Sequence, residues 1–89
     1  MRHVIPTAKP DFSEVHTLEQ LGQLVRYRRT TSGLRIDDAA LLCDVSAGSL
    51  SNLEHARKSI TADKRLRVMN GLGLALLIVP REELKDAWT

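Results

Sequence analysis

The sequence predicts a mainly α-helical domain of four to five short helices, followed by one β-strand near the C-terminus. Three observations lead to this fold class. A chain of 89 residues makes a single small domain, far below the length at which hydrophobic cores divide. Hydrophobic residues are 43% of the chain but aromatic residues only 3%, so Leu, Val, Ile and Ala must build the core, which suits packed helices. Apolar residues also recur at three- and four-residue steps, and only residues 74–80 are apolar on both faces.

The chain divides into four segments. Residues 1–16 contain two prolines and no clear period, so we expect an arm that is mobile unless a partner orders it. Residues 17–73 carry the helical pattern, and residues 74–80 form the strand. Residues 81–89 are a C-terminal tail that can add a helical turn or two.

The first helix begins at a capping box. In Thr17-Leu18-Glu19-Gln20 the Thr17 hydroxyl can accept from the Gln20 amide N–H while the Gln20 side chain reaches back. The helix ends at Ser32-Gly33, where glycine suits a left-handed cap. One apolar face follows from the helical spacing of Leu18, Leu21, Leu24 and Val25.

Three further helices are expected. A short one runs from Ile36 or Asp37 to about Cys43, with acidic residues near the positive end of its dipole. Ser46 is a good N-cap for Ala47–His55, in which Leu50 and Leu53 face inward. The outer side of this helix is left to Ser49, Ser51 and Asn52.

Thr61 caps the fourth helix, which Gly71 or Gly73 stops. The apolar residues expected to be buried there are Leu66, Val68, Met69 and Leu72.

The expected strand has no partner of comparable quality within the chain. An unpaired strand edge invites another chain, so pairing with the same strand of a second copy is the economical solution and a homodimer is expected. The residues assigned to dimerisation are Leu74, Leu76, Leu77, Ile78 and Val79.

Composition limits the class of protein. The net charge is +2, and the positive excess lies in residues 17–73, which carry nine basic and six acidic side chains. This excess of positive charge is compatible with binding to nucleic acid. The longest uncharged apolar run, 71–79, is much shorter than the roughly 20 residues of a membrane span. We therefore expect a cytoplasmic protein without a membrane partner.

The residues that could carry chemistry do not form a recognisable reactive site. Cys43 cannot close an internal disulfide and reads as a small buried hydrophobe in a reducing compartment. The three histidines are too scattered for a metal site. Gly71-Leu72-Gly73 lacks the strand and helix that flank a nucleotide loop. No metal, cofactor or enzymatic activity is expected.

Residues 33–54 have the layout of a helix-turn-helix: a short helix, a tight turn and a second short helix with small polar residues outside. Here the chain resembles the repressor-type helix-turn-helix proteins of the phage-repressor superfamily (XRE-like), and more closely the HipB-type antitoxins. The residues that carry this resemblance are Leu21-Gly22-Gln23-Leu24-Val25-Arg26, Arg29, Gly33-Leu34, Ala40, Val45-Ser46, Leu50-Ser51-Asn52-Leu53-Glu54-His55 and Leu66-Arg67-Val68-Met69-Asn70-Gly71-Leu72-Gly73-Leu74.

The resemblance implies an antitoxin that represses its own toxin–antitoxin operon. It would bind palindromic double-stranded operator DNA as a dimer and hold a HipA-type serine/threonine kinase toxin. It places the recognition helix in the major groove and makes Arg29 and Glu54 a structural ion pair. The DNA-binding residues assigned on this basis are Ala47, Gly48, Ser49, Ser51, Asn52, Lys58 and Arg35. Among them, the Asn52 amide has the chemistry to pair with adenine N6 and N7.

The chain departs from the family pattern at several positions. Arg35-Ile36 stand where Thr-Gln is usual, so a polar phosphate contact is missing; Arg35 can replace it electrostatically while Ile36 turns inward or packs on a partner. Ala56 replaces a glycine after the recognition helix. Ala39 replaces a core leucine, and Leu41 and Leu42 occupy usually polar positions.

These departures leave alternatives open. Leu41 and Leu42 are either displaced core or, with Trp88, part of a toxin-binding surface. Two other functions remain: a stand-alone helix-turn-helix transcriptional regulator, and a protein-binding helix-turn-helix with weakened DNA binding.

Overall fold

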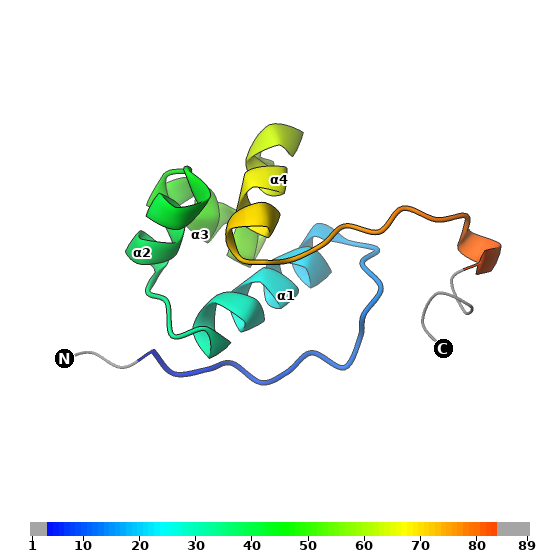
Figure 1. Ribbon diagram of the computed structural model, residues 1–89, viewed down its shortest axis with the longest axis horizontal. Helices are drawn as coiled ribbons and strands as arrows, with labels where there is room; N and C mark the ends of the chain where they lie inside the picture. The colour runs from blue at the N-terminus through cyan, green and yellow to red at the C-terminus, as the bar shows by residue number, and fades with distance from the viewer. Residues whose placement is uncertain (1–3, 84–89) are drawn as a thin grey trace.

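The computed structural model describes residues 4–83 and places four α-helices and one short 3₁₀ helix in that range (Figure 1). The mainly helical fold class is therefore confirmed. The elements are α1 (Leu18–Thr31), α2 (Ile36–Cys43), α3 (Ala47–His55), α4 (Ala62–Gly71) and η1 (Arg81–Glu83). The predicted bounds of the second and third helices match the observed ones.

Side-chain caps begin three of the helices, as predicted. The Thr17 hydroxyl accepts from the Gln20 amide at 3.1 Å, and Gln20 Oε1 accepts from the Thr17 amide at 3.2 Å, which completes the capping box of α1. Ser46 caps α3 and Thr61 caps α4 through a single bond each, in which the hydroxyl accepts from the Ser49 or the Lys64 amide. α2 begins at Arg35 without a side-chain cap.

Within two residues of its end, each of the four helices is followed by a residue with left-handed backbone. Glycine fills this position after α1 and α4, at Gly33 (φ 74°) and Gly73 (φ 71°). After α2 and α3 the position is taken by Asp44 (φ 58°) and Ala56 (φ 52°). Left-handed backbone brings Cβ close to the following carbonyl oxygen, so Ala56 carries local strain at the end of α3.

The core lies where the helices converge. Its fully buried large side chains are Val25 of α1, Leu50 of α3 and Val68 of α4. Leu66, predicted to be buried, is exposed, because its position on α4 is about 200° around the helix from that of Val68. Leu18 is also exposed, at the first turn of α1.

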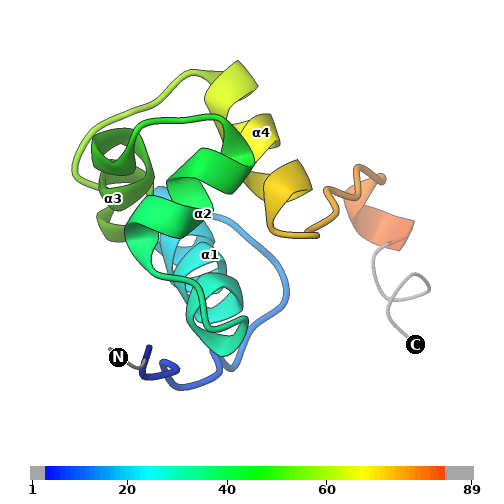
Figure 2. The same ribbon diagram turned by 60° about the vertical axis from the view of Figure 1, so that its left-hand side comes forward.

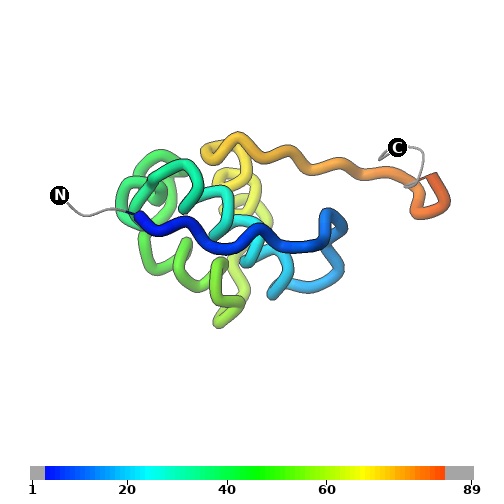
Figure 3. The backbone as a smooth tube through the Cα atoms, turned by 90° about the horizontal axis from the view of Figure 1, so that it is seen from below, coloured from blue at the N-terminus to red at the C-terminus, as the bar shows by residue number. Residues whose placement is uncertain are grey.

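The two ends of the described chain behave differently. The N-terminal arm runs along the helical body (Figure 3), where the Thr7 amide donates to the buried Thr30 hydroxyl at 3.1 Å. Residues 74–80 instead lead away from the helices (Figure 1) and carry no regular secondary structure in the single chain. Their strand was predicted to form only against a second copy, so it stays a prediction. Leu76, Leu77 and Ile78 are exposed, whereas Leu74 packs against the core.

No helix within residues 4–83 has the length and apolar character needed to cross a membrane.

Candidate nucleic-acid interface

A tight turn joins α2 to α3 and sets their relative orientation (Figure 2). The left-handed backbone of Asp44 reverses the chain, and the Val45 amide returns to the Ala40 carbonyl at 3.0 Å. Leu50 and Leu53 of α3 are buried in the common core, as predicted. The two helices thus form a helix-turn-helix unit whose second helix keeps one side toward solvent.

An ion pair fixes α3 to α1. Arg29 Nε and Nη2 donate to the two Glu54 carboxylate oxygens at 2.6 and 2.9 Å, and Nη1 donates to the Leu34 carbonyl at 2.9 Å. The Glu54 side chain is 0% exposed and that of Arg29 11%. The expected structural pair is confirmed, and its groups are held by one another rather than offered to a substrate.

The backbones of α1 and α3 also approach closely at Gly22. A Cβ at this position would lie 2.5 Å from the carbonyl oxygens of both Leu53 and Glu54. Only glycine fits there, so the contact fixes where the backbone of α3 lies against that of α1.

On the outer side of α3, the serine hydroxyls are engaged within the chain. Ser46 Oγ donates to Ser49 Oγ at 2.9 Å and accepts from the Ser49 amide at 3.0 Å. Arg57 Nη2 donates to Ser51 Oγ, and His55 Nδ1 bonds the Ser51 carbonyl at 2.9 Å. The Ser51–Arg57 contact could not be predicted from the sequence, because it depends on the left-handed turn at Ala56 that folds Arg57 back on the helix.

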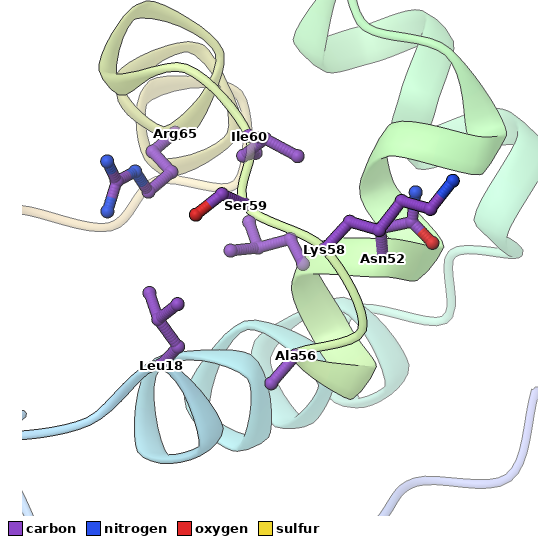
Figure 4. Close-up of a pocket in the computed structure, with 8 residues that line it drawn as sticks. Leu18, Asn52, Ala56, Lys58, Ser59, Ile60 and Arg65 are labelled. Atoms are coloured by element: carbon purple, nitrogen blue, oxygen red, sulfur yellow. The ribbon is translucent and has the colours of Figure 1, made fainter.

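Asn52 and Lys58 lie together at one end of this surface. Figure 4 shows their polar ends on the same side, turned away from Leu18 and Arg65. No hydrogen bond within residues 4–83 uses the Asn52 amide, which is half-buried and leaves its donor and acceptor available. The beginning of α3 is open: a Cβ on Gly48 would meet nothing closer than Ser46 Oγ, at 4.0 Å.

Arg35 precedes α2, and Arg57 and Lys58 follow α3; all three are exposed and have no carboxylate partner among residues 4–83. Arg28 and Arg67 have internal roles. Arg28 Nε donates to the Leu72 carbonyl at the end of α4 at 2.7 Å. Arg67 pairs with Asp63 at 2.6 Å. The cations beside the helix-turn-helix are therefore part of a wider set, because Lys9, Arg26, Lys64, Arg65 and Arg81 also lack a carboxylate partner within residues 4–83.

A hollow of about 390 Å³ lies between residues 7–12 of the N-terminal arm and α1, which contributes Gln23 and Arg26. Leu18, Asn52, Ala56 and Arg65 surround a cavity of about 10 Å³, room for a single water molecule. Within residues 4–83 no three potential metal ligands come together. Burial raises the pKa of the Cys43 thiol above its ordinary value, which makes this residue a poor nucleophile.

The outward face of α2 is unusually apolar. Leu41 is 82% exposed and Leu42 58%, so neither is displaced core. Ile36 turns inward and packs against the core, and Ala39 is fully buried. Trp88, the third residue assigned to the toxin surface, lies outside the described residues.

Comparisons of the chain with protein-family models and with curated proteins found no match. The resemblance to repressor-type proteins therefore stays a prediction drawn from the residues themselves.

Proposed function

We propose that this chain is a DNA-binding transcriptional repressor of the helix-turn-helix class. More specifically, it acts as the antitoxin of a HipBA-like operon, binding palindromic operator DNA as a homodimer and binding a HipA-type kinase toxin. The observation that supports DNA binding best is the outer side of α3, where small residues and a free amide lie next to two exposed cations, Arg57 and Lys58. An α-helix of this kind fits the major groove, and flanking cations suit phosphates.

The proposed roles divide by chemistry. Asn52 reads a base edge, and Gly48 allows the helix to approach the bases closely, whereas Ala47, assigned to DNA from the sequence, packs against the core. Arg35 and Lys58 contact phosphates on either side, which supplies affinity that falls with salt. Ser49 and Ser51, assigned to DNA from the sequence, keep their hydroxyls within the chain and help to shape the surface.

The dimer is proposed to form through residues 74–80, pairing antiparallel across a two-fold axis. Exposed leucines and isoleucine on a segment with unused backbone groups are a costly arrangement for an isolated chain. Two-fold docking would place half-sites about 34 Å apart, one helical turn.

A second candidate function is a protein-binding helix-turn-helix without DNA. The observation that favours it is the outer face of α2, where Leu41 and Leu42 are exposed and Asp37 and Asp38 occupy the first turn. Carboxylates near the DNA backbone oppose phosphate binding, whereas exposed leucines suit a protein partner. In the antitoxin proposal this face, together with Trp88, receives the kinase.

A mobility-shift assay on the protein's own promoter, with salt titration, tests the DNA-binding proposal. Asn52→Ala should relax base preference and cost about 1–3 kcal/mol. Lys58→Ala should weaken binding to every sequence and lower the salt slope by about one unit. Lys9→Ala, on the N-terminal arm, is the matched control and should change neither. Equal binding to promoter and unrelated DNA would leave the protein-binding alternative.

Two further measurements test the partners. Sedimentation should give a dimer of about twice 9.9 kDa, lost in Leu76→Pro and kept in Leu41→Ser. Co-purification with the product of the neighbouring gene should weaken in a variant lacking residues 81–89 or carrying Leu41→Ser and Leu42→Ser, with operator affinity unchanged. If that product is not a kinase, or if neither change affects its binding, the antitoxin assignment fails.

A further inference from the structure

We infer that α3 reads adenine–thymine base pairs and no guanine, so that each operator half-site is recognised at an A·T pair. The reading groups are the Asn52 amide and the open backbone surface at Gly48. This inference rests on the proposed DNA binding and adds to it the class of base pair that the protein selects.

The serine hydroxyls on the outer side of α3 already take part in hydrogen bonds within the chain. Ser49 Oγ accepts from Ser46 Oγ at 2.9 Å, and Ser51 Oγ accepts from Arg57. Each keeps one hydrogen to donate, but a single hydroxyl donor pairs with more than one kind of base and does not select among them. Of the polar side chains on the outer side of α3, the Asn52 amide is the one that no bond within residues 4–83 engages.

α3 carries no side chain of the kind that most often reads guanine. Guanine is read most often by Arg or Lys, which donate to O6 and N7. The helix has the sequence AGSLSNLEH and contains neither residue. Arg57, which follows it, is bound to Ser51 and thereby held along the helix flank, a position suited to phosphate rather than to a base. A carboxamide, in contrast, pairs bidentately with adenine N6 and N7.

The first turn of α3 leaves room for a base. Gly48 is exposed, with open space where a side chain would stand, whereas the half-buried Ala47 packs against the core. Small apolar groups at this position accommodate the thymine C5-methyl, which no other base carries. Since Asn52 lies one to two turns further along the same helix, adenine and thymine contacts are expected within one half-site.

Base analogues test this directly. A promoter fragment bound in the mobility-shift assay is resynthesised with 7-deazaadenine, 7-deazaguanine or deoxyuridine at one position at a time. The first two lack the N7 acceptor, and the third lacks the thymine methyl. We expect a loss of about tenfold at one 7-deazaadenine per half-site, a smaller loss at a nearby deoxyuridine, and no loss at any 7-deazaguanine.

Variants distinguish the side chains that contact bases from those that raise the affinity for every DNA sequence. In Asn52→Ala the 7-deazaadenine effect should disappear, because the contact it removes is already absent. Lys58→Ala should bind every fragment more weakly while keeping the same pattern of sensitive positions. Gly48→Val should bind the fragment more weakly and lose the deoxyuridine effect, since a branched side chain fills the space offered to the methyl.

The outcomes that overturn the inference differ from those that overturn the proposed function. Sensitivity to 7-deazaguanine, or an adenine effect that persists in Asn52→Ala, refutes A·T reading while leaving sequence-specific binding intact. Failure of the wild-type protein to prefer its promoter over unrelated DNA refutes the proposed function, and the inference with it.

Discussion

Replacing Glu54 by alanine is expected to destabilise the domain by about 3–5 kcal/mol, the usual cost of removing one partner of a buried ion pair. A domain of this length has a total stability of about 4–13 kcal/mol. The substitution should therefore leave the protein close to unfolding.

The structure explains why this pair should matter so much. Glu54 receives two hydrogen bonds from Arg29, and its side chain is completely buried. Without the carboxylate, the Arg29 guanidinium keeps its bond to the Leu34 carbonyl but stays in a site where it is only 11% exposed. The guanidinium thus loses two acceptors in a largely desolvated site, so its positive charge remains largely uncompensated.

Urea denaturation followed by circular dichroism, at one fixed protein concentration, measures the effect. Arg67→Ala is the matched control, because Arg67 pairs with Asp63 at the same 2.6 Å but with its side chain 45% exposed; it should cost less than about 1 kcal/mol. The double variant Arg29→Met with Glu54→Leu should be more stable than Glu54→Ala, because it leaves no unpaired charge. A Glu54→Ala loss no larger than that of Arg67→Ala would refute the reasoning.

Three further outcomes follow from the backbone and the core. Ala56→Gly should stabilise the domain by roughly 0.5 kcal/mol, since glycine relieves left-handed strain, and Gly33→Ala should destabilise it by about 1 kcal/mol; thermal unfolding that shows the same sign for both would contradict this. Gly22→Ala should lower the free energy of unfolding by at least about 1–3 kcal/mol, because the added Cβ forces α1 and α3 apart. An unchanged free energy of unfolding in urea would exclude the close contact. Cys43 is buried, so it should react with a thiol reagent only as fast as the protein opens, and rapid labelling of the native protein would contradict this. Burial also raises the pKa of the Cys43 thiol, so the free energy of unfolding should fall as pH rises past the ordinary thiol pKa.

Local chemistry explains why the helices could be placed from the sequence. Thr17, Ser46 and Thr61 each satisfy a free amide at a helix start, and these contacts span only three residues. The inward orientation of Leu50 and Leu53 follows from the helical period alone. Such short-range rules do not depend on how the helices pack against one another.

The candidate site was predictable only in part. The residues on the outer side of α3 were identified from their spacing, but the engagement of Ser49 and Ser51 was not. Hydrogen bonds of an exposed hydroxyl depend on rotamers and on turns such as the one at Ala56, whose left-handed backbone no rule for alanine predicts. The burial expected for Leu66 failed for a related reason, because membership of an apolar set does not say which face of a helix meets the core.

The sequence by itself therefore determined the helical class, the bounds of α2 and α3 and the caps of α1, α3 and α4, because each depends on contacts within one or two turns. Only the tertiary structure decided that Leu41 and Leu42 lie at the surface and that Arg57 folds back to Ser51. It also showed that α3 meets α1 closely enough to admit only glycine at Gly22. These features arise only when separate helices pack together. The distances between their backbones and side chains then determine which side chains bond or pack within the protein and which stay available to a partner.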